Sequence, residues 1–158
     1  MYYADMAVQG KDQHLQLLLE AKNKRGTSKI WAAKMRRNMY AHGLLPETPF
    51  FLLALPDKFY LWKDVGLSTD LIEPDYEINP EPFLEAYYPK AYTMPNVTLT
   101  LSEYDISSEG FELILSAWLH QILTVPSVDL LPANMNWIVN SGLFDAIHNG
   151  YLKLEELV

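Results

Sequence analysis

The chain opens with two short, mostly apolar stretches joined by turn residues. Residues 2–9 and 14–22 look extended, and Gly-Lys-Asp-Gln at residues 10–13 is typical of a turn. If Gly10 pairs with Gln13, the two stretches form a β-hairpin with one apolar face. That face consists of Ala4, Met6, Val8, Leu15, Leu17, Leu19 and Ala21. Because a slip of one residue would mix polar side chains into this face, we predict that burial fixes the register.

A basic helix is predicted after the hairpin. Thr27 or Ser28 is a suitable N-cap for a helix that runs to about His42 and ends at Gly43. Its expected core stripe, with one residue every four positions, consists of Trp31, Met35 and Met39. The opposite side, which we expect to face solvent, carries Lys29, Arg36 and Tyr40, with Arg37 alongside.

The rest of the chain predicts two more strands and then mainly helices. Residues 49–55 and 59–62 read as a buried strand and its return, whereas residues 64–95 are acidic and proline-rich and predict a loop. Four later elements are expected: a short helix near residues 83–88, an edge strand at 97–101, a long helix opening at Ser107 or Ser108, and a helix over 135–148 broken at Gly142. We expect one domain: a core at 1–63, an acidic connection at 64–102 and helices at 103–158.

Composition narrows the class of protein. Hydrophobic residues make up 49% of the 158 residues, which is enough for a packed core. The absence of cysteine excludes disulfide scaffolds, zinc–thiolate sites and thiol catalysis. The longest apolar run, residues 50–55, is far shorter than a membrane span, and the first residues lack a signal-peptide pattern. We therefore expect a cytoplasmic, soluble protein without a membrane partner.

The net charge of −8 is unevenly distributed. Residues 1–37 contain eight basic and three acidic residues, a net charge of +5, and the remaining residues carry −13. A nucleic acid would therefore be attracted only to the N-terminal quarter. The basic residues considered for phosphate contacts are Lys24, Arg25, Lys29, Arg36 and Arg37. The simpler interpretation of these residues is a solvated, charged surface.

Candidate chemistry lies on the polar face of the hairpin. In the expected register Asp5 lies opposite Leu18, and Glu20 is its diagonal neighbour at a Cα distance of roughly 7–8 Å. Two such carboxylates can converge on one Mg²⁺ ion. Lys22 follows Glu20 by two residues, so its ammonium group shares the face and can orient a metal-bound water. Glu20 and Lys22 alone are more often an exposed ion pair, but Asp5 on the same face favours metal-assisted phosphodiester hydrolysis.

These residues, in this order, resemble the PD-(D/E)xK nuclease superfamily, and most closely the nuclease-like domains of type I restriction subunits. The similarity covers about residues 3–62: Asp5, a hairpin, Glu20-Ala21-Lys22, a basic helix and a hydrophobic strand pair. It implies an α/β (α+β) restriction-endonuclease-like fold, with a mixed central sheet flanked by helices and an αβββαβ core. It further implies that Asp5, Glu20 and the Ala21 carbonyl bind Mg²⁺, or alternatively Mn²⁺. Lys22 would assist the attacking water, and the partner would be nucleic acid, DNA first.

The chain departs from the family pattern in two places. Ala4 stands where the family usually has proline, and only four residues precede Asp5 where the family has a core helix. Either the chain is a truncated product, or a later helix or a second subunit covers the apolar face of the hairpin. On this argument we expect a homodimer.

Two function classes follow from the resemblance. One is a metal-dependent nuclease, and the other is a catalytically inactive nuclease-fold protein that acts as an interaction or assembly module. A nuclease requires the carboxylates of Asp5 and Glu20 to converge in a cleft that solvent can reach, whereas a scaffold would bury or splay them.

Overall fold

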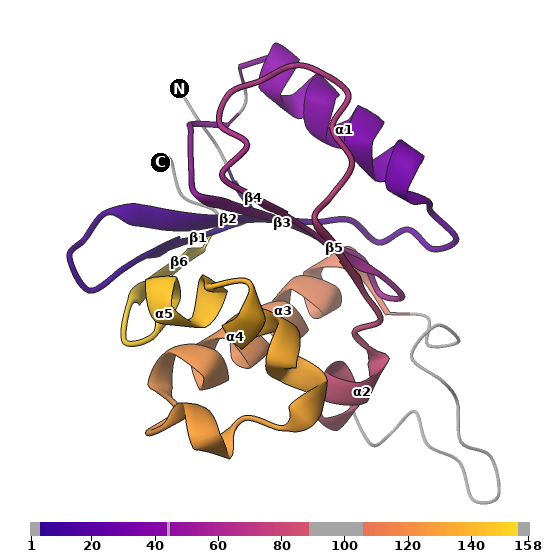
Figure 1. Cartoon of the computed structure of the whole chain (residues 1–158). Helices are drawn as coiled ribbons and strands as arrows, with labels where there is room; N and C mark the ends of the chain where they lie inside the picture. The colour runs from indigo at the N-terminus through magenta and orange to yellow at the C-terminus, as the bar shows by residue number, and fades with distance from the viewer. Residues whose placement is uncertain (1–3, 44, 89–105, 155–158) are drawn as a thin grey trace, which may run out of the picture.

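The computed structural model describes residues 4–43, 45–88 and 106–154, and its centre is a six-stranded mixed sheet (Figure 1). The strands are β1 (Met6–Gln9), β2 (Leu15–Ala21), β3 (Phe50–Ala54), β4 (Phe59–Lys63), β5 (Tyr76–Ile78) and β6 (Tyr151–Leu154). Their order across the sheet is β5-β4-β3-β2-β1-β6. β2 and β3 are parallel, and all other neighbours are antiparallel. The predicted mixed sheet flanked by helices is confirmed.

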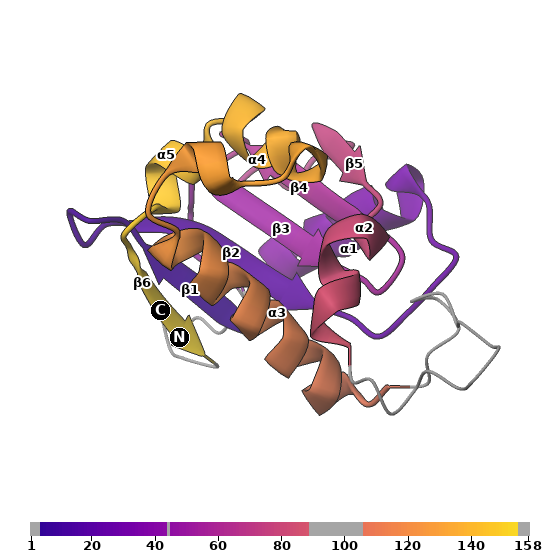
Figure 2. The same ribbon diagram turned by 90° about the horizontal axis from the view of Figure 1, so that it is seen from below.

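Helices cover both faces of this sheet (Figures 1 and 2). α1 (Lys29–Ala41) lies on one face. The other face carries α2 (Glu81–Leu84), α3 (Ser108–Thr124), α4 (Asn136–Asn140) and α5 (Leu143–Ile147), with 3₁₀ turns at Glu85–Tyr87, Val128–Leu130 and Ala133–Met135. The predicted break at Gly142 is confirmed, because this glycine adopts a φ of 87° between α4 and α5. β5 and β6 were not predicted, and the expected strand at 97–101 lies outside the described residues.

The hairpin has a longer turn than the sequence pattern predicts. The Gly10 N–H donates to the His14 carbonyl at 2.9 Å, and the Gln13 N–H donates to the Gly10 carbonyl at 2.9 Å. Gln13 adopts the left-handed conformation (φ 70°), as a three-residue hairpin loop requires. A bulge between Val8 and Gln9 adds a second shift. The predicted pairing of Gly10 with Gln13 is therefore wrong, and the register moves by two residues in total.

The two shifts restore the predicted faces because side chains alternate with a period of two. Met6 lies opposite Leu19 rather than Leu17, yet the central apolar residues still share one core. Those residues are Met6, Val8, Leu17 and Leu19. The ends of the hairpin depart from the pattern, since Ala4 and Leu15 pack on the α1 face instead.

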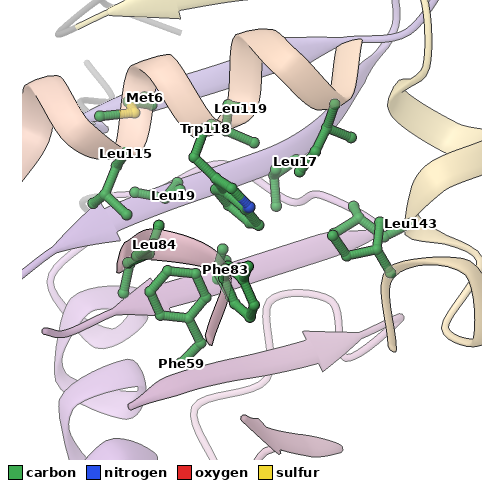
Figure 3. Packing of buried hydrophobic residues seen from close by; sticks show 14 of the residues in the cluster. Met6, Leu17, Leu19, Phe59, Phe83, Leu84, Leu115, Trp118, Leu119 and Leu143 are labelled. Atoms are coloured by element: carbon green, nitrogen blue, oxygen red, sulfur yellow. The ribbon is translucent and has the colours of Figure 1, made fainter. Parts of the chain in front are cut away.

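The apolar face of the hairpin is covered by α3, a helix from the C-terminal half of the chain (Figure 3). Trp118 of α3 lies at the centre of this contact between helix and sheet. Its ring stacks on that of Phe83, with ring centroids 5.4 Å apart. It also meets Phe59 of β4 edge-on at 5.3 Å. Of the alternatives above, a later helix therefore supplies the cover. The argument for a homodimer from an uncovered hairpin face is wrong, and the oligomeric state itself stays a prediction.

The bounds of α1 are confirmed, but its exposed side is not the one expected. The Ser28 hydroxyl accepts the Trp31 N–H and caps the helix, as predicted. Arg36 and Tyr40, expected in solvent, are instead buried. The reason is the connection between β4 and β5, which folds over α1 (Figure 1). Arg36 donates from its two terminal nitrogens to the Gly66 and Ser68 carbonyls, each at 2.9 Å.

Arg36 should therefore be important for stability. We expect Arg36→Ala to lower the free energy of unfolding by about 2–4 kcal/mol, because two carbonyls lose their partner and a void replaces the side chain. Lys34→Ala, an exposed change on the same helix, should have little effect. Thermal unfolding followed by circular dichroism measures both. Equal melting temperatures for the two variants would contradict the role of Arg36.

Candidate active site

Asp5 and Glu20 meet at the open end of the hairpin. They lie one step beyond the Met6–Leu19 pair, where β1 has not yet begun and β2 continues. The Asp5 N–H donates to Glu20 Oε1 at 3.2 Å, and the Ala21 N–H donates to Asp5 Oδ2 at 2.8 Å. Each carboxylate thus accepts a backbone N–H where the two strands separate. The two side chains are adjacent, closer than the diagonal relation that the sequence predicted.

The separation of the strands explains why Asp5 adopts this position. On its other edge β2 stays paired, since the Lys22 N–H donates to the Ala54 carbonyl of β3 at 3.0 Å. The first residue of β1 is Met6, so Ala21 has no β1 carbonyl opposite it. The Asp5 side chain fills this place. A short acidic side chain just before β1 therefore satisfies the backbone and lies beside Glu20.

The surroundings of Asp5 and Glu20 favour the neutral form of the Glu20 carboxyl group. Glu20 is only 7% exposed, and burial is the largest cause that raises its pKa, to about 8. The negative charge of Asp5 raises the pKa further, while the positive charge of Lys22 lowers it. Two carboxyl groups that share a partly dry site resist carrying two negative charges at once. Such a site therefore favours either the protonation of one carboxyl group or the binding of a cation.

The other two motif residues flank this pair. Lys22 is exposed and projects from the same face of β2 as Glu20, because side chains alternate along a strand. The Ala21 N–H points toward Asp5, and the carbonyl of a strand residue points to the same side as its N–H. The Ala21 carbonyl is therefore directed to the side of β2 on which Asp5 lies. The structure brings together the four positions that the sequence singled out.

A cavity of about 320 Å³ adjoins Asp5 on the side of α3. It is lined by Asp5, Met6, Glu109, Glu112, Leu113, Ser116 and Leu154. Sequence reasoning missed Glu109 and Glu112. Their spacing of three residues places them on one face of α3, but only the fold shows that this face meets β1. Asp5 therefore borders a hollow that solvent can reach, although Glu20 beside it is nearly enclosed.

The basic residues divide into two groups. Lys24 and Lys29 lie at the end of the sheet where β2 leads into α1, close in sequence to Lys22. The Lys24 ammonium is 5.8 Å from the centre of the Trp31 ring, and Lys29 Nζ is 3.9 Å from a carboxylate oxygen of Glu77. Arg25 and Arg37 are half-buried, and Arg36 is buried against backbone carbonyls. Arg36 therefore does not belong to any surface that a phosphate can reach.

The donor set fits a hard divalent cation that keeps most of its water. Among the described residues no group of three His, Cys, Asp or Glu side chains is placed to hold a metal. Asp5, Glu20 and the Ala21 carbonyl are oxygen donors only. Mg²⁺ is commonly bound by one or two carboxylates and several waters. The site therefore fits Mg²⁺ or Mn²⁺ better than it fits zinc, for which nitrogen and sulfur ligands are typical.

Comparisons of the chain with protein-family models, with curated proteins and with solved structures found no match. The resemblance to the PD-(D/E)xK superfamily therefore stays a prediction. Within the described ranges, no helix has both the length and the apolar character needed to cross a membrane.

The raised pKa of Glu20 predicts how stability depends on pH. A carboxyl whose pKa rises from 4.5 to about 8 on folding binds its proton more tightly in the folded state. Its contribution to stability is thus fully present below about pH 4.5 and is lost as the pH rises toward 8. Glu20→Gln keeps an oxygen that accepts the Asp5 N–H but carries no charge. We expect this variant to exceed the wild type in stability at pH 8 by roughly 1–3 kcal/mol.

Urea unfolding at several pH values between 5 and 8, with a chelator present, measures this difference. The gap between the two proteins should close as the pH falls toward 5. Glu85→Gln, at an exposed glutamate, is the control and should follow the wild type throughout. If Glu20→Gln is destabilised equally at every pH, the predicted effect of the raised Glu20 pKa is contradicted and the carboxyl pair has only a structural role.

Proposed function

We propose that this protein is a Mg²⁺-dependent nuclease that hydrolyses phosphodiester bonds of nucleic acid, with a restriction-endonuclease-like core. One observation carries the proposal. Asp5 and Glu20 meet at the open end of the hairpin, Lys22 follows Glu20 on the same face of β2, and Asp5 also borders a hollow on the α3 side that solvent can reach. Two adjacent carboxylates and one exposed cation are the groups that metal-assisted phosphodiester hydrolysis needs.

The topology supports the same core. The family resemblance implies the order αβββαβ, and β1, β2, α1 and β3 supply its last four elements in sequence. Consecutive strands usually lie side by side, so a first strand would lie next to β1 and its helix would cover the hairpin. β6 lies next to β1, and α3 covers the hairpin. In this interpretation the C-terminal half of the chain fills the places of the first helix and strand.

Each residue then has a role. Asp5, Glu20 and the Ala21 carbonyl would hold Mg²⁺, which, when bound, polarises the scissile phosphate and lowers the pKa of a water. Lys22 would orient that water and stabilise the negative charge that develops on the phosphate. Lys24 and Lys29 would bind the neighbouring phosphates of the chain, with Arg25 and Arg37 at the margin of this surface. DNA is the first substrate to test.

A second function class is favoured by a different observation. Both carboxylates already accept backbone N–H groups, and Glu20 is nearly enclosed. A pair that only ties the end of the hairpin together would have the same contacts. In that case the protein would be a catalytically inactive, nuclease-derived module for protein interaction or assembly.

Cleavage assays separate the two classes. Plasmid DNA, single-stranded DNA and RNA should be tested with Mg²⁺ and with Mn²⁺. We expect metal-dependent cleavage of at least one substrate, and Lys22→Ala should lower the rate by on the order of 10²–10³, as for other single electrostatic stabilisers. Lys11→Ala, an exposed lysine in the hairpin turn, should cleave at the wild-type rate.

Two results would refute catalysis. One is the absence of cleavage with either metal, and the other is a Lys22→Ala protein that is as active as the Lys11→Ala control. The assembly module would then be the better account.

A further inference from the structure

The cavity beside Asp5 is lined partly by apolar side chains, unlike the charged carboxyl pair. Its lining includes Met6 of β1, Leu113 of α3 and Leu154 of β6. Leu113 is 68% exposed and Leu154 is 49% exposed, so two large apolar side chains stand open to solvent at one edge of the candidate site. The remaining lining residues are polar: Asp5, Glu109, Glu112 and Ser116. An apolar hollow with a few polar groups is the usual form of a small-molecule or base-binding pocket.

From this placement we infer that the cavity receives one unpaired nucleobase of the substrate, so that the protein acts on single-stranded nucleic acid or on an extruded nucleotide. The inference rests on the proposed function, because Asp5 belongs to both the carboxyl pair and the cavity wall. Asp5 lies at the border between the pair and the hollow, so a nucleotide whose phosphate is held by Asp5 could direct its base toward the hollow. A volume of about 320 Å³ is at the low end of small-molecule pockets, roughly 300–1,000 Å³.

The chemistry of the cavity matches a base better than a phosphate. Pockets that take an extruded base combine apolar contacts on its faces with hydrogen bonds to its edge. Met6, Leu113 and Leu154 offer the apolar contacts. The acidic side chain of Glu109 disfavours a phosphate inside the cavity, so the sugar–phosphate chain would lie outside it.

The polar groups also predict which base is preferred. The Ser116 hydroxyl donates its hydrogen to the Leu113 carbonyl at 2.8 Å, which leaves its oxygen as an acceptor. Carboxylates are acceptors as well, and they bind the exocyclic amino groups of bases such as cytosine. Thymine has no amino group to offer. We therefore expect cytosine or adenine to be preferred over thymine.

A duplex can place a base in this cavity only if the base first leaves the double helix. Its bases are paired and stacked, and extruding one base breaks its pairing and stacking. Single strands should therefore bind more tightly than a duplex of the same sequence. This difference is separate from the salt-dependent attraction that Lys22, Lys24 and Lys29 exert on either form.

Fluorescence anisotropy of labelled oligonucleotides tests the inference. Oligocytidine, oligothymidine and a duplex of matched length are titrated with the wild-type protein, with Ca²⁺ in place of Mg²⁺. We expect the tightest binding for the oligocytidine strand and the weakest for the duplex. Leu113→Ala removes an exposed wall of the cavity, and Ser116→Leu fills it. Each should weaken single-strand binding about tenfold and leave duplex binding unchanged, because a base enters the cavity only from a single strand.

Leu130→Ala is the matched control, because Leu130 is 64% exposed and does not line the cavity. It should bind like the wild type. Circular dichroism shows whether each variant is folded, and Leu113→Ala remains informative if Ser116→Leu is not. Duplex binding as tight as single-strand binding, or equal affinities for Leu113→Ala and Leu130→Ala, would overturn the inference.

The outcomes also separate this inference from the proposed function. Metal-dependent cleavage without a preference for single strands would overturn the base pocket and leave the nuclease intact. A preference for single strands without any cleavage would overturn catalysis and leave the base pocket intact. Failure to bind any nucleic acid would overturn both.

Discussion

The pairing of Asp5 with Glu20 depends on one constraint, the register of the β1–β2 hairpin. Apolar residues on a single face must be buried, so the register can shift only by an even number of residues. The turn at Gln13 and the bulge after Val8 each contribute one residue to such a shift. The result places Asp5 across from Glu20, where each carboxylate accepts a backbone N–H at the end of the strand pair. The geometry of the candidate site is thus a consequence of core burial.

The same constraint requires a cover for the hairpin. A sheet that is apolar on both faces needs helices on both sides, and α1 can cover only one of them. α3 closes the second face, and its Glu109 and Leu113 then line the cavity beside Asp5. The cavity beside Asp5 therefore exists because two distant parts of the chain meet there. Packing of the core and construction of the site are coupled through this one helix.

Sequence alone predicts the elements whose patterns are local and strong. The α1 boundaries follow from Ser28 and Gly43, the helix break follows from Gly142, and the faces of the hairpin follow from alternation. β5 and β6 are three and four residues long and become strands only because β4 and β1 offer open edges. Short segments of this kind carry little periodicity, so the sequence does not mark them as strands.

The candidate site was predictable in its residues but not in its geometry. Asp5, Glu20 and Lys22 stand out because alternation places them together. The alternation of apolar residues does not mark the three-residue turn at Gln13 or the bulge after Val8, so the direct apposition of the two carboxylates was not predictable. Arg36 shows the same limit, since its burial depends on a connection some thirty residues later in the chain. Long-range contacts of this kind leave no local pattern.

The central claim is that Asp5 and Glu20 together bind one divalent metal ion. The most direct measurement is a crystal structure of the protein soaked in Mn²⁺, with data collected to show the anomalous scattering of manganese. The account predicts one anomalous peak within coordination distance, about 2.0–2.3 Å, of a carboxylate oxygen of each residue. It also predicts that this peak disappears in Glu20→Gln. Manganese bound elsewhere, with both carboxylates still held only by the backbone N–H groups, would contradict the account.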